Sequence, residues 1–404
     1  MRRAIELRAS SFELRALRAS SFELRASRFP IPQRRREVPM ADPTPLKVGI
    51  VGTGGMGRHH CDRFNEIPGV KVVAVHDVDA ARAAEVAAKY QVPLVARTLD
   101  ELLDAVDVVS VVTPDRFHAG PAIAALERGK HLLCEKPLSP TLSEAREMAR
   151  VARDAAKRGV VNMVNFSYRG SGGFAKAIEL ARGGAIGQLR QVHSWYQQGW
   201  LSTARYALDA KVDALWRLST GAGSGGVLGD LGCHILDMTS AIGGDIARAR
   251  CTLRTFDKRL ADGRWARSLN GVDLDANDLA LIECDFVDGA FGMVQTSRWA
   301  TGHGNHLRCE AHGVDGALCV DLDKHWSQVD VCTAAAMAKN GWSPEWTTEK
   351  TPDRANNWWR FIDAIRGKGP VDVDMTRGAQ VQAYLDACER SAVSGNWETI
   401  ADWM

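Results

Sequence analysis

The sequence predicts a two-domain α/β fold: a doubly wound parallel sheet, then an α+β domain with a large, mostly antiparallel sheet. The chain has 404 residues, which is long for one ordinary domain. Strand patterns alternate with helix patterns over residues 47–166, as in βαβ units. Beyond residue 166, strand-like segments separated by glycine turns predominate. These three observations together predict the fold class.

The composition excludes several other classes. Hydrophobic residues make up 45% of the chain and charged residues 25%, as in an ordinary soluble globular protein. No apolar run is long enough to predict a membrane span, so we expect no membrane partner. Nine cysteines without a C-x-x-C pair argue against a zinc ribbon and a disulfide framework. They indicate a reducing compartment, and we expect a cytoplasmic protein.

The first 39 residues differ from the rest. They contain ten Arg and four Glu, so the remaining chain is mildly acidic although the net charge is +2. A nucleic-acid partner is therefore not expected. The sequence RASSFELRA occurs at Arg8–Ala16 and at Arg18–Ala26, a ten-residue spacing that does not keep one helix face. We expect residues 1–39 to be a disordered extension, and one interpretation is a translated leader upstream of a true start at Met40. A mitochondrial targeting peptide remains an alternative, against which the four Glu count.

A glycine motif follows the first predicted strand, Lys47–Val51. The sequence GTGGMG matches G-x-G-x-x-G between a strand and a helix. Its glycines allow a tight turn, close approach of a pyrophosphate and close packing of the helix on the strand. The helix N-terminus adds free N–H groups for the phosphates. The motif predicts a Rossmann domain, in which the cofactor-binding residues include Gly52, Gly54, Gly55, Met56 and Gly57.

An acidic residue ends the second predicted strand, VKVVAVHDVD. Asp77 follows Gly52 by 25 residues, where a carboxylate accepts hydrogen bonds from ribose hydroxyls and repels a 2′-phosphate. NAD is therefore favoured over NADP as the cofactor. The alternative role for Asp77 is a helix N-cap, for which Asp79 is better placed.

The alternation of strands and helices continues to residue 165, and we place the NAD-binding domain at residues 40–165. Predicted strands are VDVVSVVTP, KHLLCEKP and VVNMVNF, with helices between them. Ligands of such sheets bind at the carboxyl ends of the strands. The residues that fall at these ends are Thr113, Pro114, Glu135, Lys136, Pro137 and Asn165.

The second domain is predicted to span residues 166–404. The segments LRQVHSWYQQGW, LALIECDFVDGAFGMVQTSRW and LRCEAHGVDGALCVDL have strand patterns with glycine turns. All twelve tryptophans lie at or beyond Trp195, which suits either a large packed surface or a core. An α+β domain with one extended sheet fits this pattern.

Two further motifs follow the glycine motif along the chain. CEKPLS occupies Cys134–Ser139, and GGVLGDLGCHILD occupies Gly225–Asp237. Together with the glycine motif, they resemble the Gfo/Idh/MocA family of NAD(P)-dependent sugar and polyol oxidoreductases. The segments VVTPDRFHA, LRCEAHGVDGALCVDLD and FIDAIRGKGPVDVD are also similar to parts of that family. The resemblance runs from Lys47 to the C-terminus.

The resemblance has implications for assembly and for the cofactor site. It implies that the C-terminal sheet keeps one open face, through which the chain forms a homodimer or homotetramer. One segment departs from the family, which often shows Val-Gly-Phe-Asn-x-Arg after the sixth strand. Here Arg169 aligns, whereas Asn165 and Ser167 differ. We expect Asn165, Arg169, Glu135 and Lys136 near the nicotinamide, and His118 to support the cofactor cleft.

Alcohol oxidation requires a hydride acceptor, a base and a group that stabilises the developing oxyanion. We assign His234 as the principal acid–base group and Lys136 as its electrostatic and proton-relay partner. Asp230 and His234 are four residues apart and would share one helix face, so Asp230 could orient the substrate or the imidazole. A lowered pKa would let Lys136 shuttle a proton. Which of Lys136 and His234 takes the proton directly stays open.

Other residues have weaker patterns. Trp200, Trp216 and Arg217 are candidates for the substrate pocket, with core or salt-bridge roles as the alternative. A metal site built from Asp230, His234 and Asp237 would leave the nucleotide-binding half unexplained.

A pair of histidines, His303 and His306, has the spacing of metal ligands. Since no third ligand clearly joins them in the sequence, no metal is predicted there.

The predicted function is hydride transfer between NAD and a secondary alcohol of a cyclic polyol or sugar, such as an inositol, a pyranose or an anhydrosugar. The alternatives are an NAD-dependent glycoside hydrolase of the same family, a non-catalytic NAD-sensing regulator and a structural oligomer. Regulators of this kind tend to lose the lysine or the histidine, and both are present here.

Overall fold

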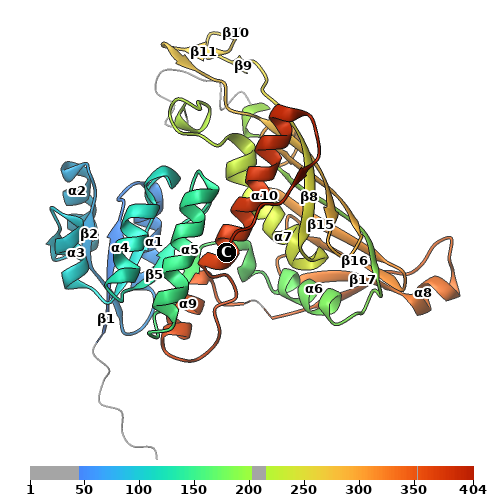
Figure 1. Cartoon of the computed structure of the whole chain (residues 1–404), viewed down its shortest axis with the longest axis horizontal. Helices are drawn as coiled ribbons and strands as arrows, with labels where there is room; N and C mark the ends of the chain where they lie inside the picture. The colour runs from blue at the N-terminus through green and yellow to red at the C-terminus, as the bar shows by residue number, and fades with distance from the viewer. Residues whose placement is uncertain (1–44, 203–214, 353) are drawn as a thin grey trace, which may run out of the picture. The chain divides into compact units, whose positions relative to one another are not determined.

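The computed structural model describes residues 45–202, 215–352 and 354–404 (Figure 1). The expectations for residues 1–39 lie outside these ranges. The described residues from Pro45 onward belong to one compact unit. Within the described ranges, no helix combines the length and the apolar character needed to cross a membrane.

A six-stranded parallel sheet forms the first half, in the order β3-β2-β1-β4-β5-β6. Its strands are β1 (Leu46–Val51), β2 (Val70–His76), β3 (Leu94–Val95), β4 (Val108–Val111), β5 (His131–Cys134) and β6 (Asn162–Val164). Its helices are α1 (Gly55–Asn65), α2 (Ala80–Tyr90), α3 (Leu99–Ala105), α4 (Ala119–Glu127) and α5 (Leu142–Ala156). The predicted doubly wound sheet is therefore confirmed.

The parallel strands are buried on both faces, which explains their uninterrupted apolar runs. All four residues of β4 are buried. Helices α3, α4 and α5 contribute to the core on one face of the sheet, whereas α1 and α2 contribute to the core on the other. Asp79 caps the N-terminus of α2, and its carboxylate accepts the Arg82 N–H at 3.0 Å, as the sequence predicts.

A nine-stranded sheet dominates the second half, in the order β18-β17-β16-β15-β7-β14-β13-β8-β19. Only the β7–β14 ladder is parallel, so the expected mostly antiparallel sheet is confirmed. Its strands are β7 (Leu189–Gln197), β8 (Ile246–Arg254), β13 (Leu279–Phe286), β14 (Phe291–Ser297), β15 (His306–Gly313), β16 (Gly316–Asp321), β17 (Gln328–Thr333), β18 (Thr347–Lys350) and β19 (Glu398–Thr399).

Two small hairpins precede β13. They are built from β9 (Lys258–Arg259), β10 (Trp265–Ala266), β11 (Ser268–Leu269) and β12 (Val272–Asp273). The remaining helices are α6 (Gly172–Arg182), α7 (Cys233–Gly243), α8 (Ala334–Lys339), α9 (Asn357–Ile365) and α10 (Met375–Ser394).

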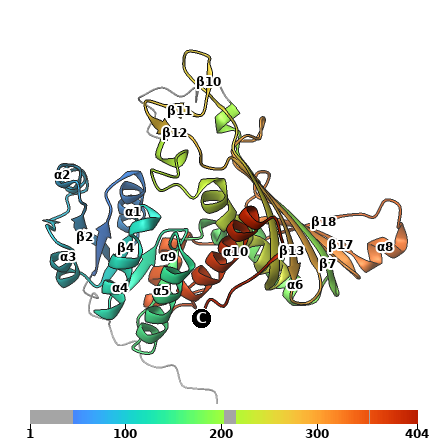
Figure 2. The same ribbon diagram turned by 45° about the horizontal axis from the view of Figure 1, so that its top comes forward.

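Helices α6, α7 and α10 cover one face of the large sheet (Figure 2). Buried and exposed positions alternate along β13 and along most of β14, as expected of strands with one covered face. Over the described ranges, no helix packs on the opposite face. That face presents partly exposed apolar side chains such as Leu281 and Met293.

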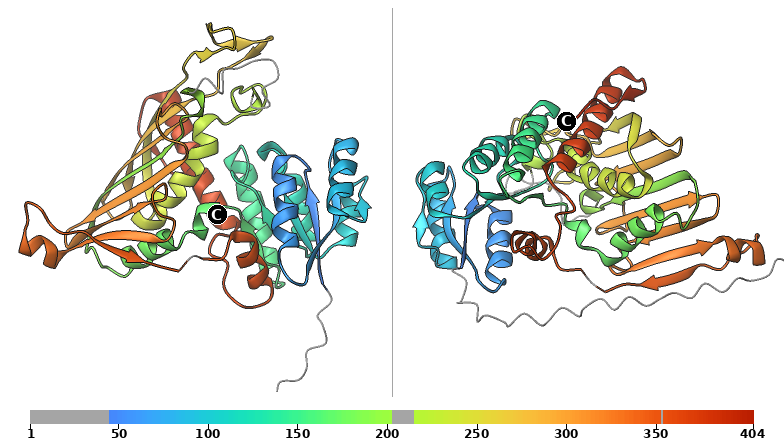
Figure 3. Two further views of the ribbon diagram at one scale, coloured as in Figure 1. Left: turned by 180° about the vertical axis from the view of Figure 1, so that it is seen from behind. Right: turned by 60° about the horizontal axis from the view of Figure 1, so that its bottom comes forward.

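Helix α9 returns to the nucleotide-binding half, although it lies near the end of the chain (Figure 3). Its residues Trp358, Phe361 and Ile362 belong to the same core cluster as Ile50 of β1 and Phe64 of α1. The parallel sheet therefore has a third helix on this face, which comes from beyond residue 350.

Candidate active site

The glycine loop has the geometry that a pyrophosphate needs. Gly52 has a φ of +100°, which favours glycine. A Cβ on Gly57 would lie 2.2 Å from the Gly52 carbonyl oxygen, so the close packing of α1 requires glycine there. A Cβ on Gly54 or Gly55 would meet nothing within 4 Å. The loop therefore leaves open space at the N-terminus of α1, where a phosphate can approach the backbone.

Asp77 lies just beyond β2, as predicted, but its carboxylate already has partners in the chain. One oxygen accepts the Thr53 N–H at 2.7 Å and its hydroxyl at 2.9 Å. The other accepts the Asp79 N–H at 2.9 Å and the Arg82 guanidinium at 2.7 Å. Burial opposes ionisation, but these hydrogen bonds outweigh it and lower the pKa of Asp77 to about 2. Ribose binding by Asp77 would require Arg82 to move.

A cavity of about 480 Å³ lies at the carboxyl ends of β4 and β5. The sequence-predicted residues that line it are Met56, Thr113, Pro114, His118, Glu135, Lys136, Asn165, Trp216, Arg217 and Asp230. Predicted residues outside its lining are Gly52, Gly54, Gly55, Gly57, Asp77, Arg169, Trp200 and His234. The structure thus brings the Glu-Lys-Pro turn and the Asp230 segment to one cavity.

Lys136 and Asp230 form an ion pair in this cavity. The ammonium Nζ donates to the Asp230 carboxylate and to its backbone carbonyl oxygen, at 3.0 Å each. The other carboxylate oxygen accepts Arg217 and Arg298, each at 3.1 Å. Burial would raise the pKa of Asp230, but the three cations outweigh burial and hold it well below its usual range. Arg298 is almost fully buried, and no sequence motif signals it.

The expected lowering of the Lys136 pKa is wrong. Burial lowers it, but the negative charge of Asp230 acts most strongly in the opposite direction, and the net shift is upward. Nearby cations and a dry pocket would lower this pKa, but the Asp230 carboxylate, 94 positions along the chain, lies 3.0 Å from the ammonium group. Lys136 is therefore an ammonium group at neutral pH, able to donate hydrogen bonds.

His234 has the opposite charge state. Burial and then the positive charge of Lys136 lower its pKa to about 3, so the imidazole is neutral at pH 7. Its ring packs edge-on against Phe166, Tyr168 and Tyr196. Its Nδ1 is buried and has no hydrogen-bond partner in the described ranges. A neutral imidazole with a free ring nitrogen can accept or relay a proton.

Asp230 and His234 do not share a regular α-helix. Asp230 lies in a π-helical turn, Leu228–Gly232, and α7 begins only at Cys233. π-helical turns are rare and occur frequently at functional sites. The prediction that Asp230 orients His234 is not supported, because the carboxylate is bonded to Lys136, Arg217 and Arg298 instead.

A buried polar network supports the Glu-Lys-Pro turn. Glu135 accepts hydrogen bonds from His60 Nε2 at 3.0 Å and from Asn165 at 2.6 Å. Asn357 of α9 donates to Asn165 at 2.9 Å, and His60 Nδ1 lies 2.7 Å from the Ser110 hydroxyl. Burial opposes ionisation of Glu135, yet His60 and Asn165 lower its pKa to about 2.

His60 and Asn357 are not among the residues predicted from the sequence. The position of His60 just after the glycine motif could have suggested it. Nothing local in the sequence connects Asn357 with Asn165, because 192 positions separate them.

Arg169 lies away from the cavity. It donates to both carboxylate oxygens of Asp237 at 2.7 Å, and Arg377 of α10 donates to one of them at 2.8 Å. Burial opposes ionisation, but the two arginines lower the pKa of Asp237 to about 2. This buried cluster joins α7 and α10 to the segment after β6, and the structure gives Arg169 no place in the cavity lining.

His118 and Trp200 have distinct environments. Both ring nitrogens of His118 face carbonyl oxygens, of Thr113 at 2.8 Å and of Pro137 at 3.1 Å. It thus connects the ends of β4 and β5, which agrees with a supporting role. The Trp200 indole donates to Gln198 at 3.1 Å and lies under the Arg298 guanidinium, and Trp200 does not itself line the cavity.

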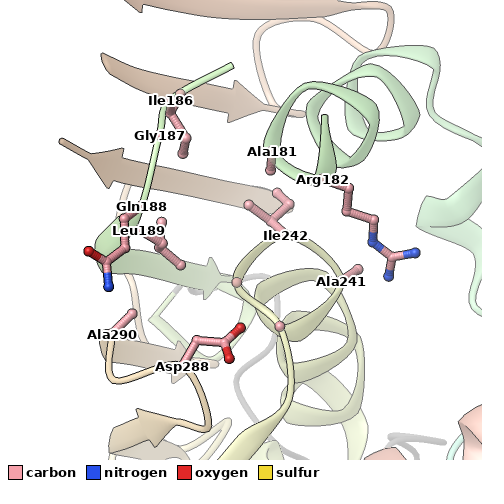
Figure 4. Close-up of a pocket in the computed structure, with 12 residues that line it drawn as sticks. Ala181, Arg182, Ile186, Gly187, Gln188, Leu189, Ala241, Ile242, Asp288 and Ala290 are labelled. Atoms are coloured by element: carbon pink, nitrogen blue, oxygen red, sulfur yellow. The ribbon is translucent and has the colours of Figure 1, made fainter. Parts of the chain in front are cut away.

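A second cavity, of about 510 Å³, lies between the ends of α6 and α7 and the segments around Gln188 and Asp288 (Figure 4). Its lining includes two charged residues, Arg182 and Asp288, and the rest is small, apolar or amide. None of the candidate catalytic residues lines it. Of the candidate catalytic residues, Lys136 and Asp230 thus line the first cavity and not this one.

Two family profiles match the chain. The profile described as "Oxidoreductase family, NAD-binding Rossmann fold" matches residues 46–166, and that of the GFO/IDH/MocA C-terminal domain matches residues 174–319. Levoglucosan dehydrogenase of Pseudarthrobacter phenanthrenivorans is 28% identical, over 87% of this chain and 97% of the relative. Inositol 2-dehydrogenase of Rubrobacter xylanophilus is 25% identical, over 87% of this chain and 92% of the relative.

The solved structures agree with the sequence comparisons. A levoglucosan dehydrogenase in complex with NADH and levoglucosan has a TM-score of 0.74 at 26% identity, and covers 89% of this chain and 100% of its own.

Proposed function

Because this chain belongs to the Gfo/Idh/MocA oxidoreductase family and carries its NAD-binding Rossmann domain, we propose that it transfers a hydride between NAD and a secondary alcohol of a cyclic polyol or sugar. The observation that carries this proposal is the pairing of Lys136 with Asp230 at 3.0 Å in the cavity. An anhydrosugar or an inositol is the first substrate to test, since the similar enzymes are named for levoglucosan and inositol.

The charge state of each residue determines its proposed role in the reaction. The bound nicotinamide supplies or accepts the hydride. The Lys136 ammonium donates to the substrate oxygen and stabilises the negative charge that develops on it. Neutral His234 accepts the hydroxyl proton, for which the substrate hydroxyl must lie within about 2.6–3.2 Å of the ring nitrogen. Asp230 keeps Lys136 charged and oriented.

Other residues would set specificity and assembly. Asp77 would favour NAD over NADP, since a carboxylate repels a 2′-phosphate. Trp216 and Arg217, which line the cavity, would contact the substrate. Residues 40–165 would bind the cofactor, while residues 166–404 would bind the substrate and form a homodimer or homotetramer through the uncovered face of the large sheet.

The experiment that tests the reaction is a substrate panel. Anhydrosugars, inositols, aldoses and glycosides are incubated with NAD and, separately, with NADP. Steady formation of NADH with at least one polyol or sugar is expected. Sugar release from a glycoside with catalytic NAD and no net NADH would instead favour a glycoside hydrolase. Tight NAD binding without turnover on any substrate would favour a regulator.

Substitution tests the assigned roles. Lys136→Ala and His234→Ala should each lower kcat by roughly 10²- to 10⁴-fold, the usual size for acid–base groups. Binding of NADH, followed by its fluorescence, shows whether each variant is folded. Lys71→Ala, at an exposed position of β2, is the control and should keep its turnover. Nearly unchanged kcat in both variants would contradict the assignment.

A further inference from the structure

Three potential metal ligands meet beyond one end of the large sheet, outside the proposed active site. His303 lies in the turn after β14, His306 opens β15 and Asp323 lies in the turn after β16. Their candidate ligand atoms all lie within 4.8 Å of one another. The sequence indicates only the two histidines as candidate ligands. The fold brings the Asp323 carboxylate beside them, from the turn after β16.

The contact of His306 with Asp321 leaves a lone pair on the other ring nitrogen, which can bind a metal. Its Nε2 lies 3.1 Å from the Asp321 carboxylate, which can only accept, so the proton resides on Nε2. The lone pair is then on Nδ1, which lies 3.0 Å from the Nδ1 of His303. A carboxylate bonded to the far nitrogen of a ligand histidine is the usual arrangement around protein-bound metals, because it fixes the ring and raises its basicity.

Asp321 is itself held in place. Its side chain is 6% exposed, and Arg308 lies 3.4 Å from its second oxygen. The side chain of His306 is 11% exposed, and its ring packs edge-on against Trp195. His306 is therefore a fixed ligand, whereas exposed Asp323 is free to turn its carboxylate toward an ion.

We propose that His303, His306 and Asp323 form a binding site for a divalent transition metal, with Zn²⁺ or Co²⁺ as fitting ions. Two imidazoles and one carboxylate match zinc, whereas Mg²⁺ and Ca²⁺ prefer oxygen ligands. Zinc–nitrogen bonds of 2.0–2.1 Å at a tetrahedral angle place two nitrogens about 3.3 Å apart. The observed 3.0 Å is close to this, so small ring movements would admit the ion. Water would complete the coordination.

The site is connected to the proposed catalytic histidine. Asn305 lies between the two metal ligands, accepts a hydrogen bond from Tyr196 at 2.7 Å and donates to Tyr168 at 3.0 Å. Both tyrosine rings pack against His234. An ion bound by His303 and His306 would hold this turn in place, and with it the two tyrosines. The metal would act as a structural element and would not touch the substrate.

Cobalt spectroscopy on the full chain tests the proposal. The purified protein is stripped with a chelator, dialysed and titrated with Co²⁺. One equivalent should bind and give the visible absorption of a four- or five-coordinate ion. His306→Ala and Asp323→Asn should each weaken binding by tenfold or more. Because Asp323 is exposed, Asp323→Asn keeps the test valid if His306→Ala fails to fold. His312→Ala, on the same strand but outside the cluster, is the matched control and should bind as the wild type does.

Two results would overturn the proposal. One is the absence of saturable binding, which would make the histidines a simple hydrogen-bonded pair. The other is binding that Asp323→Asn and His306→Ala leave unchanged, which would indicate an adventitious ion only. Zn²⁺ should also raise the thermal unfolding midpoint of the wild type by a few degrees, and not that of His306→Ala, since a ligand of the native state stabilises it. These measurements do not depend on dehydrogenase activity, so they can fail while the proposed function holds.

Discussion

Three cations around one carboxylate set the charge of the cavity. Lys136, Arg217 and Arg298 all bond to Asp230, which keeps Lys136 protonated and Asp230 ionised. His234, near the same positive charge and buried, is pushed to its neutral form. Opposite shifts of two neighbouring groups are typical of acid–base sites. At neutral pH, Lys136 is thus a proton donor and His234 a proton acceptor.

The charge state of His234 predicts a pH profile. With a pKa near 3, its acceptor form is fully present from pH 5 to pH 8. The kcat/KM for alcohol oxidation, which reports groups of the free enzyme, should therefore show no acid limb from His234 in that range. Initial rates at saturating NAD measure this, with circular dichroism at each pH to confirm folding. An acid limb centred near the ordinary pKa of 6.5 would contradict the neutral, buried imidazole.

The hydrogen bonds of the Asp77 carboxylate predict how its substitution changes the choice between NAD and NADP. Asp77→Ala should raise KM for NAD by roughly tenfold or more, the value of one or two charged hydrogen bonds. The preference for NAD over NADP should also fall, since the repulsion of a 2′-phosphate is lost. Arg82→Ala should leave NAD binding unchanged or tighter, because it frees the Asp77 carboxylate. Steady-state rates with both cofactors measure this, and equal discrimination in wild type and Asp77→Ala would contradict the role.

At the scale of elements, sequence periodicity predicts much of the structure. The runs that form β1, β4, β5 and β6 are apolar because both faces of the parallel sheet are covered. The pattern of Gly225–Asp237 fits a regular α-helix equally well, so the π-helical turn could not be predicted. Its presence depends on partners from distant segments, such as Lys136 and Arg298.

The buried cluster of Asp237, Arg169 and Arg377 predicts a stability change. Asp237→Asn leaves Arg169 and Arg377 without their counter-ion and should cost about 3–5 kcal/mol of unfolding free energy. The folded pKa of about 2 lies below the ordinary 3.8, so the stabilisation is fully present above about pH 4. It is lost as pH falls from there toward 2. Urea unfolding should therefore give the same loss at pH 7 and at pH 5.

A surface ion pair provides the control for this experiment. Glu85→Gln removes an exposed pair between α2 and Arg58 of α1 and should cost at most about 1 kcal/mol. Equal losses of unfolding free energy in the two variants would contradict the proposed contribution of Asp237 to stability.

For the whole molecule, the uncovered face of the large sheet predicts assembly. Leu281 and Met293 lie on this face of β13 and β14 and are 47% and 45% exposed. Light scattering should give a mass of two or four chains of 44.1 kDa. The double variant Leu281→Asp, Met293→Asp should shift it toward one chain. Val393→Asp, at an exposed apolar position of α10, should not. A monomeric wild type would exclude the proposed assembly.

The sequence predicts a larger part of the fold than of the candidate active site. Local motifs identified Lys136, Asp230 and the glycine loop, because each lies within a short segment of fixed pattern. The contacts of these residues join segments far apart in the chain. The Asn165–Asn357 and Arg298–Asp230 contacts have no local pattern, and the role expected of Arg169 overlooked its buried partner Asp237.

Helix α9 has a consequence for the synthesis of the protein. The glycine loop and α1 leave the ribosome about 300 residues before Trp358 and Phe361, which share a core with them. At ~5–20 residues per second, this delay is about 15–60 s. During that time Phe64 and Ile50 lack the helix that covers them in the finished chain. A chain that stops before residue 357 would therefore expose apolar surface beside the cofactor loop. The quality-control machinery of the cell would recognise its nucleotide-binding half as incompletely folded.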